Sequence, residues 1–378
     1  MRLSREWGGN WIVVFLSSAA LLVGSGCAHT SLTKGSGGPQ EVKFDEVVIT
    51  GDLELEKLND EELFAAATSF YAAEDYAQAA RYFGRICDFH QQSKHYRPAL
   101  YNAGLALEKI KAWDDAWVRF SAMSDPKANG DSLDAAFRVA ECDYHLERYN
   151  DAVDILRVIA DRSDLGADKR IEARVQQGIC ELELGSNDAA EATLRSVLTY
   201  WNGLPDKDLV DDYFPGQAQF FLGEIFRLHY EGVELDGNKS TEKLAEDLEY
   251  KSELLLSAQG HYLRAIRIGN GYWATAAGNR IGGLYENMYE HMVNAPAPAE
   301  LKAEEREVYR AELRKKIRVL ISKAITVYER TLEAAERIGA SSPFVQQTRE
   351  SLQKMKDLLL AEAKAEEAEK AAAGKPGS

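Results

Sequence analysis

The sequence predicts an all-α solenoid of helix pairs, preceded by a signal peptide and a flexible tether. Three observations predict it. Small residues recur at a near-constant interval through the middle of the chain, an apolar segment near the amino terminus ends at a cysteine, and Ser, Thr and Gly are frequent just after it. The 378 residues are 45% hydrophobic, which is enough to bury a core and argues against wholesale disorder.

The first 26 residues have the composition of an export signal. Arg2 and Arg5 form a short basic flank, and residues 11–23 are mostly apolar. This apolar stretch is too short to span a membrane as a helix, but it suits the central region of a signal peptide. We therefore expect residues 1–26 to be a lipoprotein signal peptide that is removed on export.

Three small residues, 24–26, are followed by Cys27. This resembles the lipobox of bacterial lipoproteins, although the family usually has Leu at the position of Gly24. The resemblance implies a lipid anchor on Cys27, and the alternative is an ordinary secreted protein cut near Gly26. Ala28 follows the cysteine where Asp would retain a lipoprotein in the inner membrane, so the resemblance implies the outer membrane and its periplasmic face.

Two further segments precede the helical region. Residues 27–43 are rich in Ser, Thr and Gly and form a predicted flexible tether, with a mean span on the order of 20 Å. Residues 44–58 form a predicted extended segment, because the run 47–50 (Val-Val-Ile-Thr) favours a strand. This strand either packs across the first repeat or adds to the edge of a sheet in another protein.

The chain is acidic, with a formal charge of −16. Arg2, Arg5 and Glu6 contribute a net +1 to the export segment, so the remaining chain carries −17. Such a surface repels phosphate, which argues against nucleic acid as a partner and against charge-driven binding to anionic lipid. Membrane attachment is therefore expected to depend on the lipid at Cys27.

A repeat runs through residues 59–200. Four units begin with a small residue, at intervals of 37, 36 and 38 residues: Ala67, Gly104, Ala140 and Gly178. A second small residue follows 12 positions later: Ala79, Ala116, Ala152 and Ala190. A large apolar residue stands four positions after the second: Phe83, Phe120, Leu156 and Leu194. The pattern predicts two helices per unit, with a small residue on each helix where the two pack closely.

This spacing and residue set resemble the tetratricopeptide repeat (TPR), so we expect a TPR-like solenoid; the alternative is a plain α-helical bundle. Residues 201–342 are expected to hold diverged repeats with insertions. In the fifth unit Gly223 would pair with Ala258 and Tyr262 across an insert that is partly loop. In the sixth, residues 273–293 would pair with the helix around Tyr328. Residues 343–378 are expected to form a capping helix and a charged tail.

No catalytic constellation is evident in the sequence. Cys87, Cys142 and Cys180 contain no CxxC pair and are expected to be buried as small hydrophobic residues. The seven histidines are scattered, and no HExxH or phosphate-binding loop occurs. The sequence therefore predicts no catalytic residues, no metal site and no cofactor, and the chain is expected not to be an enzyme.

The resemblance implies that the first helix of each unit lines a concave groove that holds extended peptides. The matching positions lie three before, one after and four after the first small residue. They are Phe64, Thr68, Tyr71, Tyr101, Leu105, Glu108, Phe137, Glu141 and Tyr144. Aromatic residues with acidic neighbours suit a partner that carries apolar anchors and Lys or Arg. The alternative is that several of these side chains only pack between helices.

Together these features predict a periplasm-facing scaffold lipoprotein whose groove holds other cell-envelope proteins in a complex for motility, secretion or outer-membrane assembly. The architecture resembles the repeat lipoproteins of myxobacterial gliding motility and the barrel-assembly lipoprotein, without a shared motif. The alternative function is a periplasmic carrier or chaperone that binds exported polypeptides.

Overall fold

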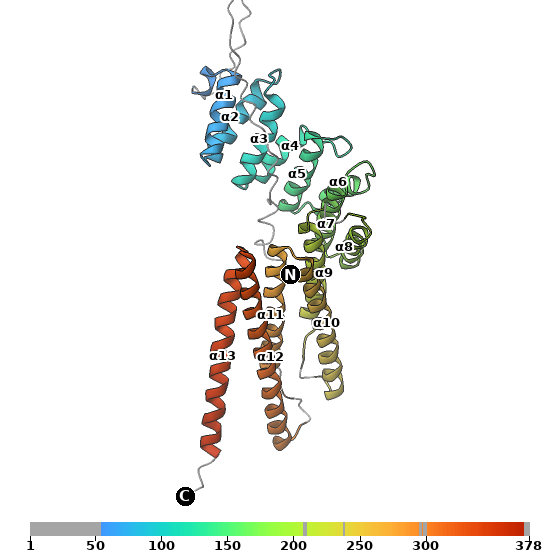
Figure 1. Cartoon of the computed structure of the whole chain (residues 1–378), viewed down its shortest axis with the longest axis vertical. Coiled ribbons are helices and arrows are strands. Elements are labelled where there is room, and N and C mark those ends of the chain that lie inside the picture. The colour runs from blue at the N-terminus through green and yellow to red at the C-terminus, as the bar shows by residue number, and fades with distance from the viewer. Residues whose placement is uncertain (1–53, 207–209, 237–238, 295–296, 298–300, 374–378) are drawn as a thin grey trace, which may run out of the picture. The chain divides into compact units, whose positions relative to one another are not determined.

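The computed structural model describes residues 54–206, 210–236, 239–294, 297 and 301–373 (Figure 1). The predicted signal peptide, Cys27, the tether and the predicted strand at 47–50 lie outside these residues. Every regular element within them is helical, and consecutive helices pack as pairs, which confirms the predicted fold class. The chain divides between Ile155 and Leu156 into two compact units, here called the N-terminal unit and the C-terminal unit.

The N-terminal unit is built of short helices. They are η2 (Leu55–Lys57), α1 (Asp60–Ala72), α2 (Tyr76–Phe89), α3 (Tyr96–Lys109), α4 (Trp113–Ser121), α5 (Asp131–His145) and the beginning of α6 (Tyr149–Ala160). The first pair starts at a capping box. Asn59 Oδ1 accepts from the backbone nitrogen of Glu62 at 2.9 Å, and the Asn59 nitrogen donates to Glu62 Oε2 at 3.0 Å. This pair of bonds satisfies backbone donors that the first turn of α1 leaves open.

Longer helices make up most of the C-terminal unit. After the end of α6 come α7 (Ala167–Glu183), α8 (Asn187–Asn202), α9 (Tyr213–Glu231), α10 (Thr241–Ile268), α11 (Gly271–Asn294), α12 (Ala303–Ile338) and α13 (Pro343–Ala373). None of the helices in the described residues is both long enough and apolar enough to cross a membrane.

The insert of the fifth unit is more helical than a loop-rich insertion would be. The described residues between Gly232 and Ser240 lie outside helices, but Thr241 begins a helix that continues without a break to Ile268. The Ser240 hydroxyl accepts from the Lys243 nitrogen at 3.3 Å and so caps this helix. Much of the insert therefore lengthens the second helix of the pair, since it is rich in Glu, Leu and Lys, which favour helix.

The turn inside each of the first four pairs has the same backbone geometry. One residue takes a positive φ: Glu74 (62°), Lys111 (60°), Glu147 (61°) and Gly185 (74°). These positions follow one another at the same 37, 36 and 38 residue intervals as the small residues. Only the last is glycine, so three non-glycine residues hold a left-handed conformation that L-residues seldom adopt.

A close contact between a small and a large residue defines the register of the pairs. A β-carbon added to Gly104 would overlap the ring of Phe120, and one added to Gly178 would lie 2.8 Å from Leu194 Cγ. In the diverged pairs, a β-carbon on Gly223 would lie 2.5 Å from Tyr262 Cε1, and one on Gly282 would overlap the ring of Tyr328. Gly282 is therefore the first small residue of the sixth unit.

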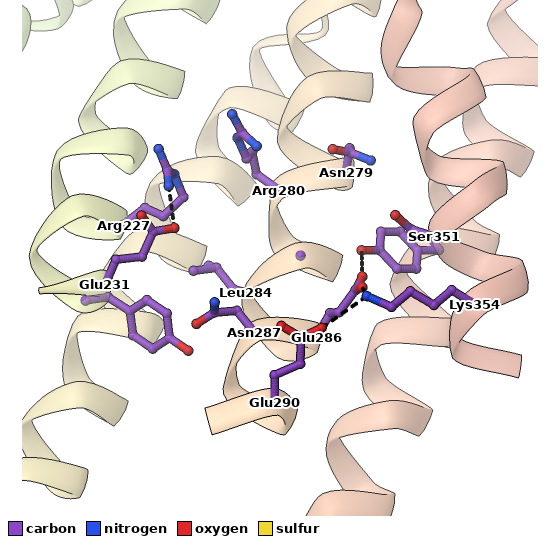
Figure 2. A pocket seen from close by; sticks show the side chains of 13 residues that line it. Arg227, Glu231, Asn279, Arg280, Leu284, Glu286, Asn287, Glu290, Ser351 and Lys354 are labelled. Carbon is purple, nitrogen blue, oxygen red and sulfur yellow. Dashed lines mark hydrogen bonds and ion pairs between the residues drawn. The ribbon is translucent and has the colours of Figure 1, made fainter. Parts of the chain in front are cut away.

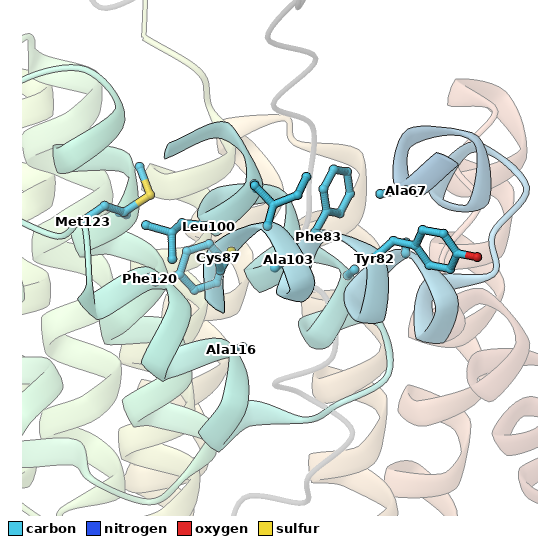
Figure 3. Close-up of a cluster of buried hydrophobic side chains, with 14 of the residues drawn as sticks. Ala67, Tyr82, Phe83, Cys87, Leu100, Ala103, Ala116, Phe120 and Met123 are labelled. Atoms are coloured by element: carbon cyan, nitrogen blue, oxygen red, sulfur yellow. The ribbon is translucent and has the colours of Figure 1, made fainter. Parts of the chain in front are cut away.

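The second small residues are fully buried at these helix crossings: Ala79, Ala116, Ala152 and Ala190 are each 0% exposed. In the N-terminal unit, Ala79 and Ala116 pack with Phe83 and Phe120 in one continuous hydrophobic cluster (Figure 3). Cys87, Cys142 and Cys180 are buried and carry free thiols, as predicted. Burial raises the pKa of the Cys87 thiol to about 12, so this thiol is a packing group and not a nucleophile.

The neighbouring glycines 282 and 283 allow a matched test of the sixth pair. We expect Gly282→Ala to lower the free energy of unfolding by about 1–3 kcal/mol, because its methyl group overlaps Tyr328. A β-carbon at Gly283 would meet no atom within 4 Å, so Gly283→Ala should leave stability unchanged or raise it by up to about 1 kcal/mol. Urea unfolding of the two variants measures the difference, and equal midpoints would contradict the assigned register.

Candidate protein-binding groove

The nine predicted groove residues lie on α1, α3 and α5 of the N-terminal unit. Their exposure differs widely. Thr68 is exposed; Phe64, Tyr71, Tyr101, Leu105 and Tyr144 are half-buried; Glu108, Phe137 and Glu141 are 5%, 7% and 8% exposed. The half-buried residues can present one side to a partner, whereas the three buried ones can form only the floor of a groove.

The aromatic groove residues also contact other side chains within the array. Phe64 stacks on His95 with ring centroids 4.5 Å apart, and Tyr101 meets the ring of Phe120 edge-on at 5.6 Å. Tyr144 meets Tyr149 of α6 in the same way at 5.5 Å. Part of each ring therefore packs between helices, as the alternative interpretation requires, and the rest is left at the surface.

Arg138 on α5 brings several of the predicted residues together. Its Nη1 lies 3.0 Å from Glu141 Oε2 and 3.4 Å from Glu108 Oε2, so α3 and α5 are joined by one guanidinium. The same guanidinium is a hydrogen-bond partner of Tyr101. We call Tyr101, Glu108, Arg138 and Glu141 the Arg138 cluster. Tyr71 on α1 lies within electrostatic range of Glu108 and Arg138.

Two buried carboxylates share the single positive charge of the Arg138 cluster. Burial, and then the neighbouring Glu141, raise the pKa of Glu108 to about 8. Burial likewise raises the pKa of Glu141 above its ordinary value, against the opposing attraction of Arg138. Within the described residues, the buried Oε1 of Glu108 has no hydrogen-bond partner. One guanidinium is therefore not enough to hold both carboxyls ionised, and a second cation brought by a partner would favour the ionised form of Glu108.

Arg138 was not among the predicted residues. It lies two positions before Ala140, an offset that the groove pattern does not include, and Glu108 precedes it by 30 residues. One feature of the sequence could have identified Arg138. It stands three residues before Glu141 on one helix, a spacing at which opposite charges pair.

The groove positions, three before, one after and four after the first small residue of a unit, also identify a second polar site in the C-terminal unit. Counted from Gly223 they give Phe220, Glu224 and Arg227, and counted from Gly282 they give Asn279, Gly283 and Glu286. Four of these line a pocket of about 320 Å³ together with residues of α12 and α13 (Figure 2). We call it the α9–α11–α13 pocket. Extending the groove pattern beyond the third unit would have found these four residues, but not the residues of α12 and α13 that complete the pocket.

Glu224 is the central buried charge behind this pocket, at 1% exposure. Arg227 Nη2 lies 2.8 Å from Glu224 Oε2, and Arg280 Nε lies 3.0 Å from Oε1. The Tyr262 hydroxyl donates to the same Oε1 at 2.5 Å. Burial opposes the ionisation of Glu224, but Arg280 and Arg227 outweigh it and hold the pKa of this carboxyl below its ordinary value. Glu224 is therefore a satisfied anion.

Within the described ranges, no group of three or more His, Cys, Asp and Glu side chains is placed to hold a metal ion. The buried His261 is a packing group. His261 accepts or donates a bond with Gln219 at 2.6 Å and stacks on Phe226, and burial lowers its pKa to about 3.

The fold and its register define a class: consecutive helix pairs pack as in a tetratricopeptide-repeat solenoid. No family model matches the chain, and no curated protein matches it. Among solved structures, a TPR repeats protein from Bacteroides fragilis is 15% identical, with 69% of this chain and 98% of that chain covered. Its TM-score is 0.31, so the register stated above rests on this chain's own helix contacts.

The Arg138 cluster predicts a pH dependence of stability. The folded state holds a proton on Glu108 up to about pH 8, whereas the unfolded chain releases it near 4.5. At Glu108 the folded state therefore binds more protons in this window, and the contribution of this group to stability falls as pH rises from 5 towards 8. Glu108→Gln stays neutral, so we expect its free energy of unfolding to fall less over the same window.

Urea unfolding at several pH values between 5 and 9 measures this difference. The control is Glu249→Gln on α10, where the side chain is exposed and the pH dependence should match the parent chain. A Glu108→Gln chain with the parent's pH dependence would contradict the buried, shared charge.

Proposed function

We propose that the chain is a non-enzymatic scaffold that binds a partner protein along the first helices of its N-terminal unit. The Arg138 cluster carries the proposal. The buried carboxyl of Glu108 needs a further cation to be held ionised, its Oε1 has no hydrogen-bond partner among the described residues, and it lies beside half-buried aromatic rings of α1 and α3. A partner segment with a Lys or Arg side chain would supply the donor, and apolar anchors beside it would cover Tyr71 and Tyr101.

We further propose that this scaffold works in the bacterial cell envelope. The support is the sequence of residues 1–28, where an export-like segment ends at Cys27 and Ala28 follows. Lipid on Cys27 would hold the chain at the periplasmic face of the outer membrane, and the segment after it would let the repeats reach their partners. A complex for motility, secretion or outer-membrane assembly is the setting that fits such an anchored scaffold.

The groove is tested with Tyr101→Ala combined with Tyr144→Ala. Truncating aromatic anchors of an interface costs about 2 kcal/mol or more, so we expect roughly 30-fold weaker binding. A photo-crosslinking amino acid at the exposed Thr68 reports capture of the partner in cells. The control is Val118→Ala on α4, which truncates a 55% exposed apolar side chain elsewhere on the same unit.

A scaffold should give one dominant crosslinked partner, which the double variant loses and the control keeps. A carrier for exported polypeptides would instead give many weak partners, all displaced by a generic unfolded protein. Because Tyr101 and Tyr144 also pack against Phe120 and Tyr149, the thermal unfolding of each variant is measured alongside. A folded double variant that captures the partner at the parent's yield would refute the groove.

The anchor is tested separately with Cys27→Ser. We expect the variant to lose labelling by radioactive palmitate and to leave the membrane fraction, because serine cannot form the thioether to lipid. Its repeats should still fold, with an unfolding midpoint equal to that of the parent chain. Cys87→Ser is the matched control, since that thiol is buried in the N-terminal unit. Palmitate labelling that persists after Cys27→Ser would rule out this anchor.

A further inference from the structure

The α9–α11–α13 pocket contains polar groups that the described chain leaves unsatisfied. Tyr230 lines the pocket and is 0% exposed, yet its hydroxyl has no hydrogen-bond partner among the described residues. The Oδ1 of Asn287, also in the lining, is buried and equally without a partner. Each such group lowers the stability of the folded chain, because it has lost its hydrogen bonds to water. A ligand that supplies hydrogen-bond donors would remove this cost.

The charges around the pocket are unevenly placed. Three cations (Arg227, Arg280 and Lys354) and three carboxylates (Glu231, Glu286 and Glu290) line it. Behind the lining, Glu224 adds a carboxylate and Lys251, whose Nζ lies 4.1 Å from the centroid of the Tyr230 ring, adds a cation. Both arginines are engaged by Glu224, and Arg227 also bonds Glu231 at 2.5 Å. The α11 side of the pocket therefore holds the surplus of acceptors.

On the α11 side of the pocket, the ammonium group of the chain's own Lys354 pairs with the carboxylates. Lys354 of α13 pairs with Glu286 and lies 3.1 Å from Glu290 Oε1 (Figure 2). Its side chain is 53% exposed, whereas that of Glu286 is 14% exposed and also accepts from the Tyr328 hydroxyl at 3.1 Å. A lysine on a flexible stem whose side chain is half in water is easily displaced, because water screens its ion pairs.

We propose that the α9–α11–α13 pocket binds an organic cation with N–H donors, a primary ammonium or a guanidinium, which takes the place of the Lys354 ammonium. The cation would pair with Glu286 and Glu290 and donate to Asn287 Oδ1 and the Tyr230 oxygen. At about 320 Å³ the pocket lies at the small end of the range for ligand sites, which suits one basic side chain or a small amine. This site is independent of the Arg138 cluster.

Isothermal titration calorimetry on the full chain in detergent tests the proposal with four probes. Two blocked tripeptides carry the cation, acetyl-Gly-Lys-Gly-amide and acetyl-Gly-Arg-Gly-amide. Acetyl-Gly-norleucine-Gly-amide is the neutral control of similar size, and cadaverine is a free amine. We expect the cationic probes to bind and the norleucine peptide not to bind. Peptide binding without cadaverine binding identifies a polypeptide side chain as the ligand, and the reverse identifies a free amine.

Two variants should change binding in opposite directions. Tyr230→Phe removes a hydroxyl that has no partner, so the variant should be as stable as the parent or more stable, yet bind the cation about 10-fold more weakly. Lys354→Met removes the competing ammonium and should bind the cation more tightly by several-fold. A purely structural role for these residues would give no change in binding from either variant.

Binding of the norleucine peptide as tight as that of the lysine peptide would overturn the proposal, as would the absence of binding by all cationic probes. Unchanged affinity in both Tyr230→Phe and Lys354→Met would do the same, since the cation would then bind elsewhere. Gly283→Ala serves as a folded blocking variant, because its methyl group points to open space in the lining and should weaken binding without loss of stability.

Discussion

The whole array depends on one steric constraint, the contact between a small residue on the first helix of each pair and a large residue on the second. A β-carbon at Gly104, Gly178, Gly223 or Gly282 would overlap or crowd the side chain opposite it. The glycines let the helix axes approach until the large side chain fills the space between them. The contact persists in the fifth pair although an insert separates its helices, so it constrains the pairing more strongly than loop length does.

This constraint also explains which features could be predicted from the sequence. The helix pairs and the all-α class were predictable, because small residues recur at fixed intervals where paired helices cross closely. The length of α10 was not predictable, because the helix crossing at Tyr262 does not determine at which residue the helix begins. Arg138 was missed because it lies outside the groove offsets and its partner Glu108 is 30 positions away in the sequence. The pocket was missed because it needs Lys354 of α13 to meet α11, a contact outside the repeat.

The two units bury charge in opposite ways on corresponding helix faces. In the N-terminal unit one arginine serves two carboxylates, and the pKa of Glu108 rises to about 8. In the C-terminal unit two arginines serve Glu224, and its pKa falls. Removal of a carboxylate from water is costly in both cases, so the number of cations nearby decides whether it stays ionised. The first arrangement lacks a cation that would hold Glu108 ionised, whereas the second has the cations that Glu224 needs.

Unsatisfied buried groups lower the stability of a folded chain, so their location is informative about binding. Glu108 Oε1 and Asn287 Oδ1 both lack a hydrogen-bond partner among the described residues. Each is on a first helix, and at each place two carboxyl groups share one cation. A donor with positive charge would satisfy both kinds of site, and the net charge of −16 would attract such a partner over a distance set by ionic strength. Affinity at either site should therefore weaken as salt is added, whereas the packing at Gly104 and Gly282 should not respond to salt at all.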